Sequence, residues 1–334
     1  MTFALGSFRS EGQPSFCGMT FAEGGVARVV ALKTLLEGLG EGWPAMASHS
    51  LLSLFDQWDS NLVWLRRARE FLGSEAGRRV RRFDLSALHV DAPHVPRQIL
   101  CVGANYRTHV IDILLAQPSP RMAGMAPAER RAEAARMMDE RAATGTPYAF
   151  SKLPSCVLGP YDSLVLPHDV MQPDWELELA VVIGRPARHV DRANAMNHVA
   201  GFGVANDVTA RERVYRADIP DLATDFLAGK SCPGFLPFGP WITPRDFVDH
   251  RDLTITLRLN GETMQNGHTA DMVFDVPRQI EYLSNRVQLW AGDVICTGSP
   301  AGNGMHHRRF LRPGDELDGS ITGLGSLHNR CMAE

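Results

Sequence analysis

The sequence predicts an α+β fold in which strands dominate, and three observations support this prediction. From Ile99 onward, short apolar runs such as ILCVGAN and LAVVIG alternate with Gly, Pro, Asn and Asp, which is typical of strands and turns. Residues 253–259 alternate between apolar and polar side chains, and Asn260-Gly261 follows them as a hairpin turn signal. Helical patterns are few in this part of the chain.

The first 92 residues have a different pattern of strand-like and helical segments, which predicts a small N-terminal domain. Two strand-like segments precede two helical stretches (19–22, 26–30, 50–55 and 61–71). Pro93 and Pro96 then mark a linker. We therefore expect one domain at residues 1–92 and a larger one at residues 97–334.

A helical segment interrupts the larger domain. Residues 127–141, PAERRAEAARMMDER, have Pro at the start and small or apolar side chains along one side. They lie within residues 117–147, a span flanked by Pro and Gly that we interpret as an insertion. Two roles stay open for it: a cover over a larger substrate pocket, or a surface or dimer-contact helix. A further helix is expected after Asp275, a suitable N-cap.

The composition excludes several classes of protein. The chain has 334 residues, 44% of them hydrophobic and 22% charged, as in globular proteins. A formal net charge of −4 gives no domain-wide positive field, so we expect no nucleic-acid partner. Six scattered cysteines without a C-x-x-C pair indicate reduced thiols. Without a signal-like start or an apolar run of ~20 residues, we expect a soluble cytoplasmic protein and no membrane partner.

Two glutamates in the run WELELAVVIG have the spacing of one strand face. Since side chains alternate along a strand, Glu176 and Glu178 project together, and the apolar residues between and beside them face the other way. The glutamate face becomes apolar further along, at Ala180 and Val182. Carboxylates directed toward an apolar region need a cation or a proton. The solvent face of an amphipathic strand is the alternative.

A third carboxylate follows the apolar run HVAGFGVAN. This residue, Asp207, is a metal ligand candidate, and a simple turn is the alternative. Three hard oxygen ligands with no nearby His or Cys suit Mg²⁺, with Mn²⁺ or Ca²⁺ also possible, and do not suit Zn²⁺. The pattern therefore predicts a metal site at Glu176, Glu178 and Asp207.

Two cationic side chains lie downstream. Arg211 comes four residues after Asp207 and is expected on the same side of a helical turn. Lys230 lies in a Gly-Lys-Ser run that lacks the earlier glycine of a P-loop, because Thr224 occupies that position. Either side chain is alternatively an ordinary surface residue.

A histidine–carboxylate pair follows the strand-like run ILCVG. His109 and Asp112 are three residues apart at an expected helix start, so they share a helical face. A carboxylate beside an imidazole raises its basicity and fixes its tautomer, which a general base needs. A surface ion pair is the alternative.

A glycine-rich loop, TGSPAGNG, follows the apolar segment 293–296. Glycine lets backbone N–H groups approach an anion, so Gly298 and Ser299 are candidates for substrate binding, with a wide turn as the alternative. The chain has no G-x-S-x-G, G-x-G-x-x-G or H-E-x-x-H motif, which argues against a serine hydrolase, a dinucleotide-binding protein and a zincin.

In their order and spacing, these segments resemble the fumarylacetoacetate hydrolase family over about residues 99–330. The segments that carry the resemblance are ILCVGANYRTHV, FSKLPSCVLGPYDSLVLP, ELELAVVIGRPARHV, VAGFGVANDVTAR, GKS with GFLPFGPW, LNGETMQNGHTADMVF, GDVICTGSPAGNG and GSITGLGSLHN. The resemblance implies a mixed β-sandwich roll in which a Glu-x-Glu pair and a downstream Asp hold the metal. It also implies a homodimer.

The family's functional residues fall on positions already noted. The resemblance implies metal ligation by Glu176, Glu178 and Asp207, catalytic roles for His109, Asp112 and Lys230, and substrate contacts from Arg211, Lys230, Gly298 and Ser299. Three departures bear on the substrate more than on the metal. Val214 replaces a frequent Gln, Pro233 replaces the usual Asp, and the insertion is longer than in simple members.

The reaction that the resemblance implies is Mg²⁺-dependent hydrolysis of a C–C bond. The substrate would be a 1,3-diketo acid of the acylpyruvate or fumarylpyruvate type, cleaved to pyruvate and a carboxylic acid, as in aromatic catabolism. Decarboxylation, tautomerisation or hydration of oxaloacetate-like or dienoate 2-keto acids is an alternative, because each needs a stabilised enolate. A non-catalytic β module that binds metal or ligand is an alternative of another class.

Overall fold

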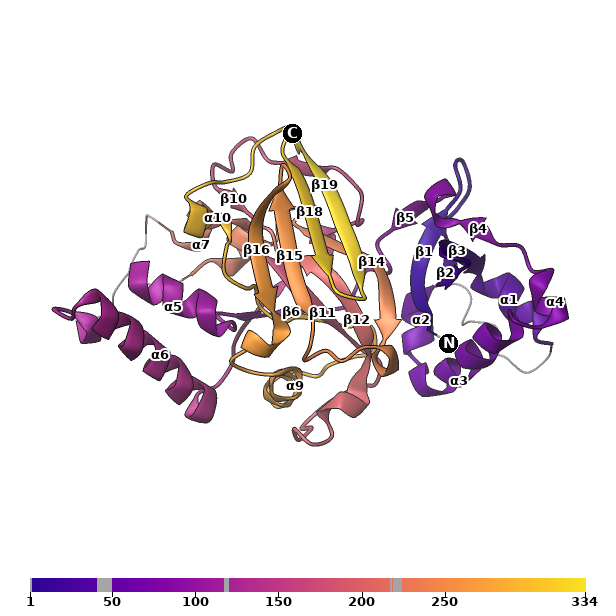
Figure 1. Cartoon of the computed structure of the whole chain (residues 1–334), viewed down its shortest axis with the longest axis horizontal. Helices are drawn as coiled ribbons and strands as arrows, with labels where there is room; N and C mark the ends of the chain where they lie inside the picture. Colours follow the sequence, from indigo (N-terminus) through magenta and orange to yellow (C-terminus); the bar gives the residue numbers. More distant parts are fainter. Residues whose placement is uncertain (1, 41–49, 117–119, 217, 219–223) are drawn as a thin grey trace.

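The computed structural model describes residues 2–40, 50–116, 120–216, 218 and 224–334, and Figure 1 shows its arrangement. The first three residues of the expected insertion, 117–119, lie outside this description. The N-terminal elements form one end of the molecule, and helices α5 and α6 form the other (Figure 1). No helix in the described ranges is both long and apolar enough to cross a membrane.

The N-terminal elements match the sequence pattern closely. They are β1 (Ala4–Arg9), β2 (Phe16–Glu23), β3 (Val26–Ala31), α1 (Leu32–Gly38), α2 (Leu51–Phe55), α3 (Trp58–Phe71), α4 (Glu75–Arg78), β4 (Phe83–Asp84) and β5 (His89–Asp91). The expected strands and helices at 19–22, 26–30, 50–55 and 61–71 are therefore confirmed.

The remaining residues form the strand-rich body and its helices. The strands are β6 (Ile99–Gly103), β7 (Tyr148–Lys152), β8 (Val157–Leu158), β9 (Leu164–Leu166), β10 (Pro173–Asp174), β11 (Leu177–Ile183), β12 (Val199–Asn206), β13 (Thr209–Ala210), β14 (Leu236–Pro244), β15 (Thr254–Leu259), β16 (Glu262–His268), β17 (Val294–Cys296), β18 (Glu316–Ile321) and β19 (Gly325–Ala333). The helices are α5 (Arg107–Ala116), α6 (Pro127–Thr144), α7 (Arg211–Val214), α8 (Phe226–Lys230), α9 (Val276–Ser284) and α10 (Gly304–His307).

Two large sheets build the body, and a pair of short strands lies beside them. The larger sheet has the order β4-β3-β2-β1-β14-β12-β11-β17-β6-β7, and the second has the order β16-β15-β18-β19-β9. The predicted hairpin is confirmed: β15 pairs with β16 across Asn260 and Gly261, both at positive φ. The predicted cap is confirmed as well, since the Asp275 side chain accepts a hydrogen bond from the Arg278 backbone at the start of α9.

Strand β11 places its alternate residues in two different cores. Leu177, Leu179 and Val181 pack against apolar side chains of the second sheet, such as Ile255 and Leu317. Residues on the other face, such as Ala180 and Val182, belong to a core shared with the N-terminal helices. Glu178 lies in the same strand, on the face of Ala180 and Val182, and is 3% exposed. Strand alternation therefore gives β11 one face for the sandwich core and another that carries Glu178.

The N-terminal elements are joined to the body by both a strand pair and a core. Strand β1 pairs antiparallel with β14 through Leu5 and Ile242, so one sheet runs across the predicted linker. Side chains from both sides of the linker, including Phe55 and Phe238, occupy one hydrophobic cluster. Domain boundaries at residues 92 and 97 remain a prediction, and the contacts described here make the N-terminal elements part of the same packed unit.

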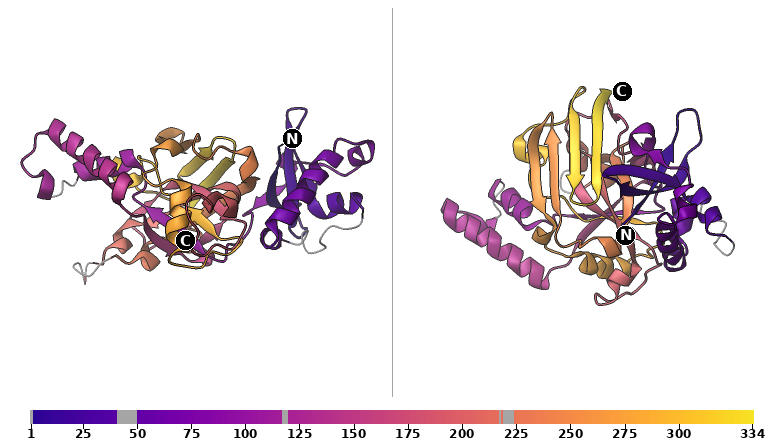
Figure 2. Two further views of the ribbon diagram at one scale, coloured as in Figure 1. Left: turned by 90° about the horizontal axis from the view of Figure 1, so that it is seen from below. Right: turned by 45° about the vertical axis from the view of Figure 1, so that its right-hand side comes forward.

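The inserted helix packs on the helix that carries His109. Apolar residues of α6, including Ala134 and Met138, cluster with Val110 and Ile111 of α5. Arg107 Nη2 also forms an ion pair with Asp139 Oδ1 at 2.9 Å. Both views in Figure 2 show α6 projecting beyond the sheets at the end opposite the N-terminal elements. The insertion therefore supports α5 from its outer side.

One buried asparagine fixes the junction between β6 and α5. The Asn105 side chain donates to the carbonyls of Phe274 and Thr297 at 3.1 and 2.7 Å, and accepts from the Phe274 backbone at 2.9 Å. Its side chain is fully buried, so these three bonds satisfy groups that no water reaches. Asn105 therefore fixes the position of the start of α5 relative to the end of β17, just before Gly298.

Candidate metal centre and active site

Three acidic side chains converge at the ends of β11 and β12. One carboxylate oxygen from each of Glu176, Glu178 and Asp207 lies within 4.8 Å of the others. The strand pairing brings them together, because Glu178 lies opposite Ala205 and the Asp207 backbone donates to the Glu176 carbonyl at 2.8 Å. Within the described part of the chain, no other group of three His, Cys, Asp or Glu side chains is arranged to share an ion.

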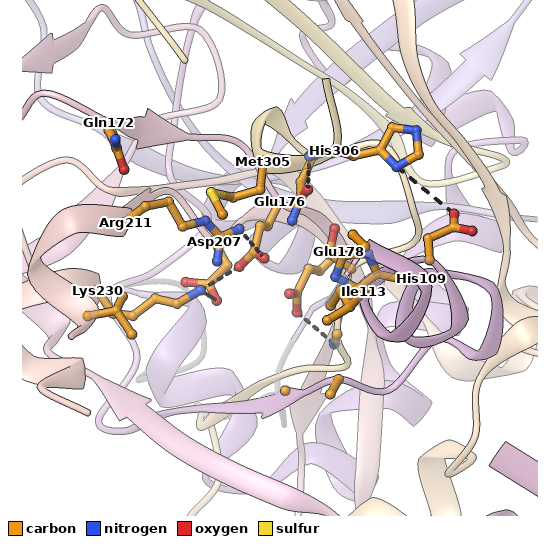
Figure 3. Close-up of a pocket in the computed structure, with 18 of the residues that line it drawn as sticks. His109, Ile113, Gln172, Glu176, Glu178, Asp207, Arg211, Lys230, Met305 and His306 are labelled. Carbon is orange, nitrogen blue, oxygen red and sulfur yellow. Dashed lines mark hydrogen bonds and ion pairs between the residues drawn. The ribbon is translucent and has the colours of Figure 1, made fainter. Parts of the chain in front are cut away.

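Lys230 and Arg211 neutralise one side of this acidic cluster. Lys230 Nζ lies 2.5 Å from Glu176 Oε2 and 2.6 Å from Asp207 Oδ2, and Arg211 Nη2 lies 2.6 Å from Glu176 Oε1. Burial alone would raise the pKa of Glu176, but these two cations outweigh it and hold that pKa well below its usual range. Figure 3 shows both cations reaching the cluster from one side, opposite His109 and Ile113.

The helical turn expected to join Asp207 and Arg211 is wrong. Strand β13 lies between them, and α7 begins only at Arg211. Arg211 reaches the site because β13 pairs with β10, which brings the arginine beside Asp174 and Glu176. Arg211 therefore lies beside the acidic cluster through strand pairing and not through a helical turn.

Two buried residues of the site were missed in the sequence. Lys152 Nζ lies 2.8 Å from Asp207 Oδ1 and donates to the Val208 carbonyl at 3.0 Å. Asp174 accepts from Arg211 Nε at 2.7 Å. Asp174 could have been found, since it precedes Glu176 and Glu178 at the same period of two. Lys152 ends a strand far away in sequence and carries no local signal.

The donor set fits a hard divalent cation. Burial raises the pKa of Glu178 well above its usual range, and the neighbouring Asp207 carboxylate raises it further. Asp207 Oδ1 is buried and contacts Lys152 Nζ at 2.8 Å, which leaves its second lone pair for a metal ion. A buried carboxylate with an unused lone pair, beside a second that is hard to ionise alone, is the environment that a cation stabilises. Glu176, Glu178 and Asp207 would hold the ion.

The charges around this centre favour an anionic ligand once a divalent ion is bound. Four buried carboxylates (Asp174, Glu176, Glu178 and Asp207) face three cations (Lys152, Lys230 and Arg211). With all four carboxylates ionised, these side chains carry one net negative charge, and a bound divalent ion would bring the total to one positive charge. A small carboxylate would then meet a positive local field.

His109 faces the acidic cluster from α5. It is 8% exposed, and burial lowers its pKa below the ordinary 6.5 despite the nearby charge of Glu176. Asp112 lies one turn further along α5, and its ion pair is with His306 Nδ1, at 4.0 Å from Asp112 Oδ2. Over the described residues, no hydrogen bond joins His109 to Asp112, so the proposed orienting role of Asp112 rests on their proximity alone.

The glycine loop after β17 closes the site from another side. The Gly298 backbone N–H donates to Glu178 Oε2 at 2.7 Å. Its φ of +99° favours glycine, and a Cβ there would lie 2.8 Å from Asn105 Cβ and from the Val102 carbonyl. Ser299 is buried and accepts from Gln265 Nε2 at 2.8 Å. Gly298 therefore orients a metal-ligand candidate, while Ser299 lines the cavity.

These side chains line one cavity of about 1170 Å³. The acidic cluster, His109, Asp112, Arg211, Lys230, Gly298 and Ser299 all contribute to its wall. Phe150 and Phe226, stacked at 4.7 Å between ring centroids, form an aromatic part of the lining. Val214, the departure from a frequent Gln, also lines the cavity and presents an apolar surface there. All the candidate residues therefore face one cavity.

Comparison with known proteins defines the class. Residues 98–332 match the family model described as fumarylacetoacetate (FAA) hydrolase C-terminal. The chain is 37% identical over 240 residues to the mitochondrial oxaloacetate tautomerase FAHD2A of Homo sapiens, covering 71% of this chain and 67% of that protein. It is 33% identical over 274 residues to oxaloacetate tautomerase YisK of Bacillus subtilis, covering 80% and 79%.

A solved structure supports the same conclusion. Fumarylacetoacetate hydrolase from the psychrophilic Exiguobacterium antarcticum aligns with a TM-score of 0.73 and 30% identity, covering 100% of both chains. The fold and site define an enzyme class with a buried acidic centre that can bind a divalent metal. The chain belongs to the fumarylacetoacetate hydrolase family, which confirms the resemblance and the strand-rich fold inferred from the sequence.

Glu178→Gln is expected to abolish high-affinity Mn²⁺ or Mg²⁺ binding. The loss should exceed the roughly 10- to 100-fold that changes in outer partners cost, because a ligand itself is removed. Isothermal titration calorimetry, or Mn²⁺ titration followed by electron paramagnetic resonance, measures it. Asp112→Asn is the control, since Asp112 lines the same cavity without joining the acidic cluster. Equal affinity in Glu178→Gln and the wild-type protein would contradict the assigned centre.

Proposed function

We propose that the chain is a divalent-metal-dependent enzyme that forms and stabilises the enolate of a small 2-keto acid. The reaction that the site supports best is keto–enol tautomerisation of an oxaloacetate-like 2-keto dicarboxylate. The main observation in support is that one carboxylate oxygen from each of Glu176, Glu178 and Asp207 lies within 4.8 Å of the others, beside a buried histidine. Relatives named oxaloacetate tautomerase, at 37% and 33% identity, favour this substrate class.

The acidic centre would provide the electrostatic part of the reaction. A divalent ion held by the three carboxylates supplies Lewis-acid stabilisation of the charge that develops on the keto oxygen. We propose Mg²⁺ as this ion, with Mn²⁺ or Ca²⁺ as alternatives, because all the ligands are hard oxygens. The chain's own contribution is to pair Glu176 and Asp207 with Lys152, Lys230 and Arg211, which fixes these ligands in place.

His109 is the proposed base. Because burial lowers its pKa, the ring is neutral at physiological pH and can accept a proton. It approaches the centre from the side opposite Arg211 and Lys230 (Figure 3). A 2-keto acid bound at the acidic centre would then direct its C3 carbon toward His109 and its carboxylate toward Arg211 and Lys230.

Lys230 is assigned to binding and charge stabilisation. Burial would lower its pKa, but the adjacent Asp207 and Glu176 raise it above the ordinary value, so the amine stays protonated. Two of its protons are directed to Glu176 and Asp207, which leaves one N–H for a substrate oxygen. Arg211, 20% exposed at its side chain, is the second cation within reach of a substrate carboxylate.

Hydrolysis of a C–C bond in a 1,3-diketo acid is the second candidate. The cavity of about 1170 Å³, with its aromatic wall of Phe150 and Phe226, has room for an acyl group that oxaloacetate lacks. The likeness to the fumarylacetoacetate hydrolase from Exiguobacterium antarcticum favours it as well. In this reaction His109 would remove a proton from water and not from C3 of the substrate. Family membership favours either enzyme over a non-catalytic β module.

Three further properties are proposals. We expect a homodimer and a cytoplasmic location, on the resemblance and the sequence composition respectively. A place in aromatic catabolism would follow only if the hydrolytic reaction proves to be the main one.

A substrate panel separates the two reactions. With Mg²⁺, we expect the enol of oxaloacetate to convert to the keto form faster than any acylpyruvate yields pyruvate, and EDTA should abolish both. Ultraviolet absorbance follows the enol, and a coupled assay follows pyruvate. Faster pyruvate release from an acylpyruvate would overturn the proposed order of reactions. Full activity in EDTA would overturn metal dependence.

The pH profile tests the base. Since only neutral His109 accepts a proton and its pKa is lowered, kcat/KM should fall toward acid with a midpoint below pH 6.5. His109→Gln should lose about 10²- to 10⁴-fold in kcat while Mn²⁺ binding survives. His328→Gln, an exposed histidine paired with Asp318, is the matched control. A midpoint above 6.5, or an active His109→Gln, would show that another group is the base.

A further inference from the structure

We propose that His306 is a second proton-transfer residue, which connects His109 through Asp112 to the solvent. The proposal rests on the proposed function, because it concerns the proton that the enolising base removes. It assigns a role to a histidine that the sequence motifs left unassigned. Three sets of contacts support it.

The first is the position of Asp112 near two histidines. Asp112 Oδ2 lies 4.0 Å from His306 Nδ1, an ion pair drawn as the dashed line from the His306 ring in Figure 3. Asp112 also lies three residues after His109 on α5, so both occupy one helical face. All three side chains line the same cavity.

The second is the rigid support of the short helix α10, which carries His306. Asp174 accepts from the backbones of Gly304 and Met305 at 2.5 and 3.2 Å. The Asn303 side chain caps the helix by accepting from the His306 backbone at 3.1 Å. A Cβ at position 304 would lie 2.7 Å from Asp174 Oδ1, so glycine permits this close approach.

The same support ties His306 to the acidic centre. Asp174 accepts from Arg211 Nε at 2.7 Å, and Arg211 in turn holds Glu176. One buried carboxylate therefore sets the position of α10 relative to the proposed metal ligands. A histidine held in this way faces the cavity at a fixed place, which proton transfer requires.

The third is a difference in exposure between the two histidines. His109 is 8% exposed, whereas the side chain of His306 is 45% exposed. When a substrate fills the cavity and separates His109 from bulk water, a neighbouring side chain that reaches water can carry the proton out. His306 meets this requirement, and Asp112 is an acceptor near both rings, three residues after His109 on α5 and 4.0 Å from His306 Nδ1.

The proposed transfer is balanced. The C3–H bond of the keto acid breaks, its electron pair forms the C2–C3 double bond of the enolate, and the proton moves to neutral His109. The proton then passes by way of Asp112 to His306, which releases it to water. The reverse sequence delivers a solvent proton to C3. The net change is exchange of a C3 hydrogen with the solvent, without oxidation or reduction.

The test uses pyruvate as the probe, because its methyl group exchanges hydrogen only through the enolate. The full-length protein with Mg²⁺ is incubated with pyruvate in D₂O, and NMR follows the loss of methyl protons. His306→Ala should slow this exchange at least about tenfold. Added imidazole should restore much of the rate by replacing the missing ring. His328→Ala is the control, since the His328 ring pairs with Asp318 on the second sheet and is not among the residues that line the cavity.

The outcomes separate a relay from a structural role. His306→Gln keeps the size and polarity of the side chain, so it should behave like His306→Ala without imidazole if proton transfer is the function. Unchanged exchange in both variants, loss that imidazole does not restore, or no exchange by the wild-type protein would each overturn the relay. Wild-type protein that exchanges pyruvate with His306 dependence but does not tautomerise oxaloacetate would overturn the proposed reaction and support the relay.

Discussion

The structure of the site depends on the burial of negative charge at the ends of β11 and β12. Glu178 and Asp207 are 3% and 0% exposed, and Asp174 is fully buried as well. Carboxylates in such surroundings are stable as ions only when cations compensate them. Lys152, Lys230, Arg211 and a divalent ion would each compensate part of this charge, so the fold around the centre is also its electrostatic support.

This constraint accounts for contacts that reach well beyond the three proposed ligands. Arg211 is held by Asp174, which also fixes α10, and Gly298 donates to Glu178. Because the centre joins β11, β12, β17 and α5, a shift in any of these elements changes the geometry of the ligands. The inserted helix α6 contributes indirectly, since it packs on the outer side of α5. The sequence left a pocket cover and a surface helix open as roles for the insertion; in the structure α6 packs on α5, and its Arg131 also lines the cavity.

Much of the site could be predicted because short-range periodicity carries it. The period of two placed Glu176 and Glu178 on one face, and the helical spacing placed His109 near Asp112. Other features depend on long-range pairing that no local pattern records. Lys152 meets Asp207 from a distant strand, and Asp112 pairs with His306 from a different element. For the same reason, the sequence did not indicate that β1 pairs with β14 and continues the central sheet.

The central claim is that three carboxylates bind one hard divalent ion to which a keto acid can also coordinate. Crystals grown with Mn²⁺ and oxalate, an analogue of the enolate form of a 2-keto acid, test it most directly by anomalous diffraction. We predict a single strong peak at roughly 2.0–2.6 Å from an oxygen of each of Glu176, Glu178 and Asp207, with oxalate bound to it. A peak elsewhere, or none at this centre under saturating Mn²⁺, would contradict the account.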